Sequence, residues 1–290
     1  MNRRENLKTL SLGVGAILSN PVGIAAMIPD NTHKSEQTQI RHSVSRWCYA
    51  STPLEKLVDF CKEKNIHSIE LLEPDEYKYV TKKGLTCAVA NGPETHITRG
   101  FNEPALHPYL LNEYRRLIPM AADAGIPNII CFSGNRNGLD DKKGLENCVQ
   151  GLEPVVKLAE KYKITLIMEL LNSKVDHSDY QCDHTSWGVG LVEKMASPHF
   201  KLLYDIYHMQ IMEGNIIDTL RKNISSVAHI HTAGVPGRND LDQNQELNYP
   251  AIFRTLKEIG YSGFIGQEFI PKKQNPLESL WDSVQMVEQA

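Results

Sequence analysis

The chain is predicted to be an α/β protein, a single-domain (β/α)8 TIM barrel, and three observations support this. From residue 40 onward, short runs of β-branched and apolar residues alternate with longer amphipathic segments, as in parallel strands joined by helices. The chain has 290 residues, of which 41% are hydrophobic, and a barrel of about 250 residues forms one domain. The sequence has no G-x-G-x-x-G or G-x-x-x-x-G-K-[ST] turn, which a doubly wound nucleotide-binding sheet would need.

Each unit of the predicted barrel contributes a strand and then a helix, within a barrel domain expected to span residues 41–290. The expected strands are His42–Trp47, Ile66–Leu71, Leu85–Ala90, Asn128–Ser133, Thr165–Leu170, Phe200–Asp205, Ser226–His231 and Phe264–Glu268. The expected helices are Pro53–Lys64, Ala105–Ala124, Leu145–Tyr162, Thr185–Ala196, Ile216–Asn223, Tyr249–Ile259 and Pro276–Glu288, with a shorter piece at Asp75–Lys83. Thr52 and Pro53 are typical of a helix start, as N-cap and first helical residue.

Residues 1–30 have the features of an export signal. A basic start is followed by an apolar, Gly/Ala-rich stretch from Leu10 to Ile28, which is the organisation of a signal peptide. Arg3 and Arg4, followed by Leu7 and Lys8, resemble a twin-arginine signal. We therefore expect an exported or periplasmic protein, with residues 31–40 as a linker and no membrane segment after signal removal. The alternative is an amphipathic helix packed on the barrel, which the glycines and proline of this stretch would interrupt.

Charge and cysteine content exclude several classes of function. The net charge is -4 and the pI about 6.3, so no basic excess favours a nucleic-acid partner. The six cysteines form no C-x-x-C pair, which argues against a zinc knuckle or a thioredoxin-like motif. We expect them to be small core residues, while a disulfide in an exported protein stays open.

Four of the predicted strands end on a residue that can bind a metal ion. The fifth to eighth strands run through apolar residues and stop on Glu169, Asp205, His231 and Glu268 respectively. Active sites of TIM barrels form at the carboxyl ends of the strands. Any one of these residues alone would be an ordinary loop or core residue, but four in register on successive strands indicate a common site.

A divalent cation would explain this set of side chains. Burying three carboxylates close together without a cation is very costly. Three carboxylates and one imidazole suit Mn²⁺, Mg²⁺ or Co²⁺ better than an ion that prefers thiolates, and Zn²⁺ is also compatible. Two further residues end strands near this site. Glu70 is expected to support a ligand or contact the substrate, and Trp47 to stack on the substrate or pack at the barrel mouth.

The segments Met168–Asn172, Tyr204–Gln210, His229–Arg238 and Gly266–Phe269 carry a resemblance to a known family. The chain resembles the hydroxypyruvate isomerase family of xylose isomerase-like TIM barrels, whose close relatives include ketose 3-epimerases. The resemblance covers residues 42–288. The Asp-x-x-His and Ala-Gly-Val-Pro-Gly-Arg segments are fairly specific together, although each alone would be a weak signal.

The resemblance implies a role for each matching residue. Glu169, Asp205, His231 and Glu268 would hold the metal ion, and the two glutamates would also move protons. His208 and Arg238 would contact substrate oxygens. Hydroxypyruvate isomerases typically have Gln at the third metal position, whereas His231 matches the 3-epimerases, so the exact substrate stays open. Relatives are often dimers or tetramers, which leaves a homo-oligomer open.

The expected chemistry is proton transfer next to a carbonyl group. A metal ion stabilises the enediolate that forms when a C–H proton is removed, and two carboxylates can take and return the proton. We therefore expect a metal-dependent isomerase or epimerase of carbohydrate metabolism, of the aldose–ketose or 3-epimerase type. Its substrate would be a small sugar or hydroxy-keto acid.

Three other functions remain alternatives. A sugar or keto-inositol dehydratase, which is a lyase, would share the first step on the same scaffold. A periplasmic sugar-binding protein would not need four ion-binding residues around its ligand. An abasic-site endonuclease would need more His and Glu ligands and a basic face for DNA.

Overall fold

The computed structural model describes residues 40–93 and 96–289. Within them, eight parallel strands form one sheet in the order β2-β1-β8-β7-β6-β5-β4-β3. The strands are β1 (Arg41–Ser45), β2 (Ser68–Glu70), β3 (Val89–Ala90), β4 (Asn128–Cys131), β5 (Thr165–Glu169), β6 (Phe200–Asp205), β7 (Val227–Thr232) and β8 (Phe264–Gln267). The predicted export signal (1–30) and nearly all of the predicted linker (31–40) lie outside the described residues and stay predictions.

The barrel nearly closes between β2 and β3. These strands form no regular ladder, but isolated parallel bridges join Ser68 to Thr86 and Leu72 to Ala90. The backbone N–H of Leu71 also donates to the carbonyl of Val89 at 2.7 Å. The predicted (β/α)8 barrel is therefore confirmed, with isolated bridges in place of a regular ladder between β2 and β3.

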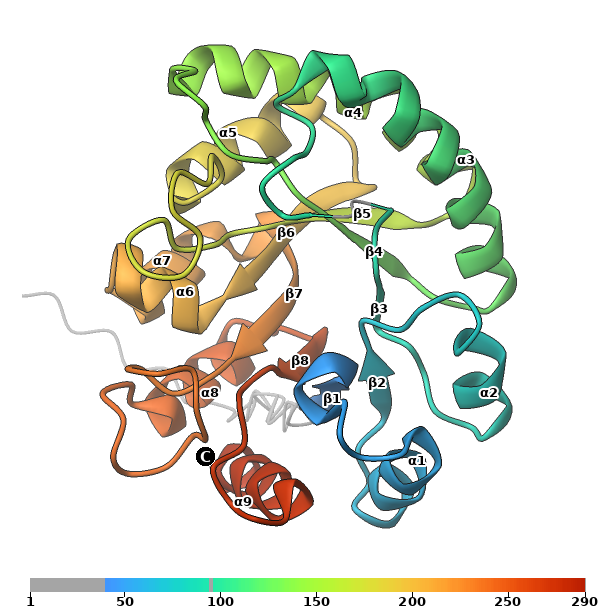
Figure 1. Ribbon diagram of the computed structural model, residues 1–290. Helices are drawn as coiled ribbons and strands as arrows, with labels where there is room; N and C mark the ends of the chain where they lie inside the picture. Colours follow the sequence, from blue (N-terminus) through green and yellow to red (C-terminus); the bar gives the residue numbers. More distant parts are fainter. Residues whose placement is uncertain (1–39, 94–95, 290) are drawn as a thin grey trace, which may run out of the picture. The chain divides into compact units, whose positions relative to one another are not determined.

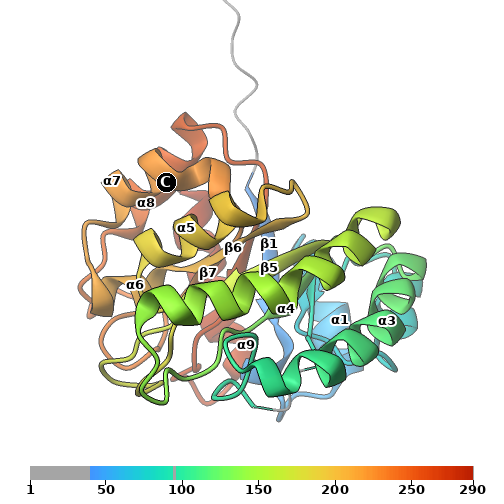
Figure 2. The same cartoon turned by 90° about the horizontal axis from the view of Figure 1, so that it is seen from above.

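Helices surround the strands in chain order (Figure 1). They are α1 (Leu54–Glu63), α2 (Tyr77–Lys82), α3 (His107–Asp123), α4 (Asp141–Tyr162), α5 (Thr185–Met195), α6 (Ile206–Met212), α7 (Ile216–Asn223), α8 (Tyr249–Glu258) and α9 (Pro276–Glu288). Short 3-10 turns lie at η1 (Arg46–Tyr49), η2 (Pro104–Leu106) and η3 (Ile224–Ser226). Figure 2 shows α3, α4 and α5 side by side along the outer face of the strands.

Local sequence explains where several helices begin and end. The side chain of Asp140 caps α4 by accepting from the backbone N–H of Lys143 at 2.8 Å, which satisfies one free N–H of the first turn. The same helix ends at Lys163, which adopts a left-handed backbone with φ of 58°. Asn275 caps α9, and Pro276 follows it in the first turn, where proline is favoured.

Several predicted boundaries differ from the structure. β1 ends at Ser45 and not at Trp47, and α4 begins at Asp141 and not at Leu145. The predicted start of α1 was wrong, because the helix begins at Leu54 with Pro53 in the N-cap position and no side-chain cap.

β2 is shorter than predicted because Leu71 has a positive φ of 53°, which ends the extended backbone. β3 is shorter because the N–H of Ala88 donates to the hydroxyl of Ser68 at 2.8 Å instead of to a strand. The helix α6 was not expected, and it begins directly after Asp205, whose side chain accepts from the N–H of His208 at 3.2 Å.

Apolar side chains fill two layers. The larger cluster packs between the strands and the surrounding helices. A smaller one fills the barrel interior, with members such as Ile130, Ile167, Leu203 and Phe264. None of the helices in the described ranges combines the length and the apolar content needed to cross a membrane.

Candidate active site

Four side chains from four successive strands meet inside the barrel. Glu169 and Asp205 are the last residues of β5 and β6, His231 lies near the end of β7, and Glu268 directly follows β8. Residues two apart on a strand face the same side, and Glu169 and Asp205 each lie two positions after a residue of the interior cluster, Ile167 and Leu203. One ligand-type atom from each lies within 4.8 Å of those from the other three, and all four residues are buried.

Several polar atoms of this cluster lack a hydrogen-bond partner. They include Oε1 of Glu169, Oδ2 of Asp205 and Nδ1 of His231. The Nδ1 atom of His231 lies 3.0 Å from Glu268 and 3.5 Å from Glu169. Buried polar atoms normally have partners, and carboxylates with one imidazole are suitable donors for a divalent cation. The four predicted ligands therefore form a group that could bind a metal ion.

Burial and mutual repulsion control the charge of two of these carboxyl groups. Burial, helped by the charges of Glu268 and Glu169 and opposed by that of Arg238, raises the pKa of Asp205 to about 7. Burial likewise raises the pKa of Glu169, and the nearby charge of Glu268 adds to this. Burying like charges together disfavours their ionised forms, which a bound cation would reverse.

Glu268 differs because two hydrogen-bond donors and the ring of His231 surround it. Trp47 donates from its indole nitrogen at 2.7 Å, Arg238 from Nη2 at 2.5 Å, and His231 lies at 3.0 Å. Burial alone would raise the pKa of Glu268, but the charges of His231 and Arg238 hold it well below its usual range. Glu268 is therefore a carboxylate with a fixed orientation.

A cavity of about 370 Å³ opens over this cluster at the barrel mouth. Its lining residues are Trp47, Leu71, Glu73, Asn91, Gly92, Ile97, Ile130, Phe132, Glu169, Leu171, His177, Arg238 and Glu268. Trp47 and Arg238, two predicted substrate contacts, thus lie on its wall, where the guanidinium is 5.2 Å from the indole ring centre. His177 was not predicted as a site residue, since nothing in its local sequence marks it.

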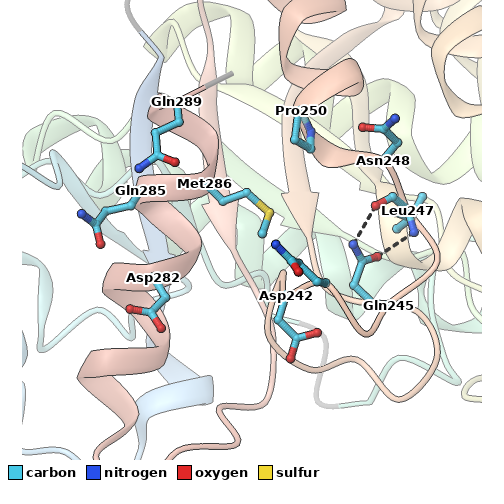
Figure 3. A pocket seen from close by; sticks show the side chains of 10 residues that line it. Asp242, Gln245, Leu247, Asn248, Pro250, Asp282, Gln285, Met286 and Gln289 are labelled. Carbon is cyan, nitrogen blue, oxygen red and sulfur yellow. Dashed lines mark hydrogen bonds between the residues drawn. The ribbon is translucent and has the colours of Figure 1, made fainter.

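A larger hollow lies outside the barrel mouth. It has a volume of about 680 Å³ and lies between α9 and the segment that leads into α8 (Figure 3). Amide and carboxylate side chains such as Gln245, Gln285 and Asp282 line it. None of the predicted site residues lines this hollow, so the site is assigned to the smaller cavity.

His208 is fully buried beside the cluster instead of lining the cavity. Its Nε2 atom lies 3.7 Å from Oδ2 of Asp205, and its Nδ1 atom lies 2.7 Å from the amide nitrogen of Asn172. The side-chain oxygen of Asn172 accepts from the backbone N–H groups of Val175 and Asp176. The amide nitrogen of Asn172 must therefore face His208, so Nδ1 accepts and Nε2 carries the hydrogen.

Glu70 lies behind the cluster, away from the cavity. It is fully buried and absent from the cavity lining. Its carboxylate lies 2.8 Å from Nε2 of His231 and 3.0 Å from Nε2 of His229. Of its two expected roles, this position favours support of a ligand over contact with the substrate. The correction could not come from the sequence, because Glu70 and His231 are 161 positions apart.

A family model described as a xylose isomerase-like TIM barrel matches residues 51–288. The chain belongs to this family. The family resemblance expected from the sequence is thereby confirmed.

Several curated proteins of this kind are similar to the chain. A mouse protein named as a candidate hydroxypyruvate isomerase is 28% identical over 265 residues, covering 88% of this chain and 90% of the mouse protein. The human protein of the same name is 33% identical over 40% of this chain, but the match spans only 44% of its own length. A 2-oxo-tetronate isomerase from Cupriavidus necator is 34% identical over 38% of this chain and 41% of that protein. These relatives support an isomerase-class enzyme.

Solved structures share the fold. The AP endonuclease family 2 protein of Brucella melitensis has a TM-score of 0.74 at 23% identity, covering 82% of this chain and 96% of that protein. The 3-keto-D-glucoside 4-epimerase of Escherichia coli has a TM-score of 0.72 at 18% identity, covering 87% and 100%. At these identities the likeness concerns the barrel alone.

Proposed function

We propose that the chain is a metal-dependent isomerase or epimerase of a small hydroxy-carbonyl compound, similar to hydroxypyruvate isomerase. The observation that carries this proposal is the convergence of Glu169, Asp205, His231 and Glu268 under one cavity, with buried polar atoms that lack partners. A divalent ion, with Mn²⁺, Mg²⁺ or Co²⁺ preferred to Zn²⁺, would polarise the carbonyl group and stabilise an enediolate.

The protein's own residues supply the proton transfer. Glu169 and Glu268 line the cavity from β5 and β8, so each can reach a carbon next to the substrate carbonyl. One carboxylate takes the C–H proton and the other returns one, which gives isomerisation or epimerisation according to the receiving carbon. Trp47 and Arg238 keep Glu268 in one orientation.

Binding of the substrate would use the cavity walls. His208 does not line the cavity, and its Nε2 N–H lies next to Asp205, so we assign it to the surroundings of that ligand and not to the substrate. Arg238 already forms an ion pair with Glu268 at 2.5 Å, so the carboxylate of Glu268 partly neutralises its charge. A volume of about 370 Å³ accommodates sugars as well as a three-carbon hydroxy-keto acid. The proposal therefore covers both substrate classes.

Hydrogen–deuterium exchange in D₂O tests the proposal. Metal-loaded protein is mixed with hydroxypyruvate, a panel of ketoses and keto-inositols, and followed by NMR. We expect deuterium next to a carbonyl, abolished by Glu169→Gln or a chelator and retained in Asp183→Asn, whose carboxylate pairs with Arg136 elsewhere. Product that has lost water would favour the dehydratase. No exchange on any compound, with sugar binding that survives chelation, would favour a binding protein.

A further inference from the structure

Behind the four-residue cluster lies a second buried group that the proposed proton transfer does not use. Glu70, at the end of β2, lies between His229 and His231, which are two residues apart on β7. All three side chains have no exposed surface. One carboxylate oxygen of Glu70 lies 2.8 Å from Nε2 of His231, and the other lies 3.0 Å from Nε2 of His229.

The contact with Glu70 decides which nitrogen of His231 faces the other carboxylates. A carboxylate only accepts hydrogen bonds, so Nε2 of His231 carries a hydrogen and donates it to Glu70. The opposite nitrogen, Nδ1, then points toward Glu268 and Glu169. An imidazole that donates from one nitrogen to a carboxylate is fixed in its rotation and is a stronger metal ligand through the other.

We propose that Glu70 is a positioning residue for the metal centre, which holds His231 with Nδ1 toward the ion and is itself held by His229. The hydroxyl of Ser45 supports the same carboxylate, donating to Oε1 at 3.3 Å. This inference rests on the proposed function, because it requires an ion at the four-residue cluster.

Gly266 gives independent evidence that the barrel accommodates the contact between Glu70 and His231. A Cβ atom at Gly266 would lie 2.1 Å from Oε1 of Glu70 and 2.7 Å from Cδ2 of His231. Among the described residues, Gly266 is not one of the glycines with a positive φ, so its backbone conformation does not require glycine. Glycine is required here because Glu70 and His231 occupy the space that a Cβ atom would fill.

The three residues Glu70, His229 and His231 could themselves offer atoms to an ion. Their position relative to the cavity argues against this use. None of the three lines the cavity, whereas Glu169 and Glu268 do. The inference therefore predicts one ion per chain.

Calorimetric titration with Mn²⁺ tests the inference on the purified full chain. We expect one ion per chain in the wild type and an affinity about 10–100-fold weaker in Glu70→Gln. The matched control is Asp183→Asn, which removes another buried carboxylate and should leave Mn²⁺ affinity unchanged. An equal affinity in Glu70→Gln and wild type would overturn the inference, as would two ions in the wild type and one in the variant.

Two further variants cover the case in which Glu70→Gln does not fold. His229→Gln keeps the carboxylate and removes only its support, so we expect a weakening of a few fold. Gly266→Ala should displace Glu70, and Co²⁺ bound to it should give an altered visible spectrum. Unchanged spectra and affinities in both variants would contradict the inference. Wild-type protein that binds no ion would instead refute the proposed function itself.

Discussion

The indole nitrogen of Trp47 donates a hydrogen bond to Oε1 of Glu268 at 2.7 Å. The two residues are 221 positions apart and meet because β1 and β8 are neighbouring strands. Arg238 binds the other oxygen of the same carboxylate. The orientation of one proposed proton-transfer group thus depends on two residues from separate loops at the barrel mouth.

Trp47→Phe should lower turnover while leaving the fold intact. The variant keeps an aromatic ring at the mouth but loses the hydrogen bond to Glu268. A hydrogen bond to a charged group contributes roughly 1.5–3 kcal/mol, and the low end applies here because Trp47 is 44% exposed. We expect kcat to fall about tenfold. Trp281→Phe, on α9, is the control and should keep wild-type turnover, and equal kcat values for both variants would contradict this role.

Asn172→Ala should reduce both stability and activity. The Asn172 side chain accepts from two backbone N–H groups and lies 2.7 Å from Nδ1 of His208. Losing these buried hydrogen bonds should cost about 1–3 kcal/mol in the free energy of unfolding, and a freely rotating His208 should lower kcat. Asn147→Ala removes another buried asparagine and should lower stability alone. Urea unfolding and steady-state kinetics on both variants measure this difference.

Metal affinity should increase as the pH rises from 5.5 to 8. Burial raises the pKa of Asp205 to about 7, so below that pH an ion must displace its proton. Burial alone would lower the pKa of His231, but the carboxylates of Glu268, Glu169 and Glu70 raise it well above its ordinary value, which adds a second proton. Each displaced proton costs about tenfold in affinity per pH unit below the pKa. Calorimetry from pH 5.5 to 8 should record this slope, and a flat profile would contradict it.

His42 should make the protein less stable at mildly acidic pH. Burial, aided by the charge of His67, lowers the pKa of His42 from 6.5 to about 4. The unfolded chain therefore binds a proton below pH 6.5 that the folded chain does not, and stability is lost as the pH falls from 6.5 toward 4. Between pH 7 and pH 5 this loss should be about 2 kcal/mol.

The comparison of wild type with His42→Gln isolates this effect. The variant cannot take up the proton, so its unfolding free energy should fall by about 2 kcal/mol less over the same interval. Glu288 is the carboxylate that faces the ring, at 3.9 Å with a half-exposed side chain. Urea unfolding at both pH values checks the difference. Parallel pH profiles for the two proteins would show that His42 has no such role.

Sequence periodicity predicted the barrel because its signals are local. Apolar runs and helix starts such as Pro276 lie within a few residues of the elements they define. The positive φ of Leu71 and the hydrogen bond from the backbone N–H of Ala88 to the hydroxyl of Ser68 depend on contacts between strands. The shortening of β2 and β3 therefore could not be read from the sequence.

The same distinction between local signals and long-range contacts applies to the candidate site. Glu169, Asp205, His231 and Glu268 were predicted because each ends a strand, and topology alone brings strand ends together. The contacts of Glu70 with His231 and of Asn172 with His208 join residues 161 and 36 positions apart. Their roles depend on side-chain directions inside the barrel, which local sequence does not specify.

Anomalous X-ray diffraction from crystals grown with Mn²⁺ would locate the metal ion itself. We expect one strong anomalous peak per chain, within bonding distance of Glu169, Asp205, His231 and Glu268, and its loss in Asp205→Asn. A peak bound elsewhere, or no peak in crystals of wild-type protein soaked to saturation, would contradict the assignment of these residues as the metal centre.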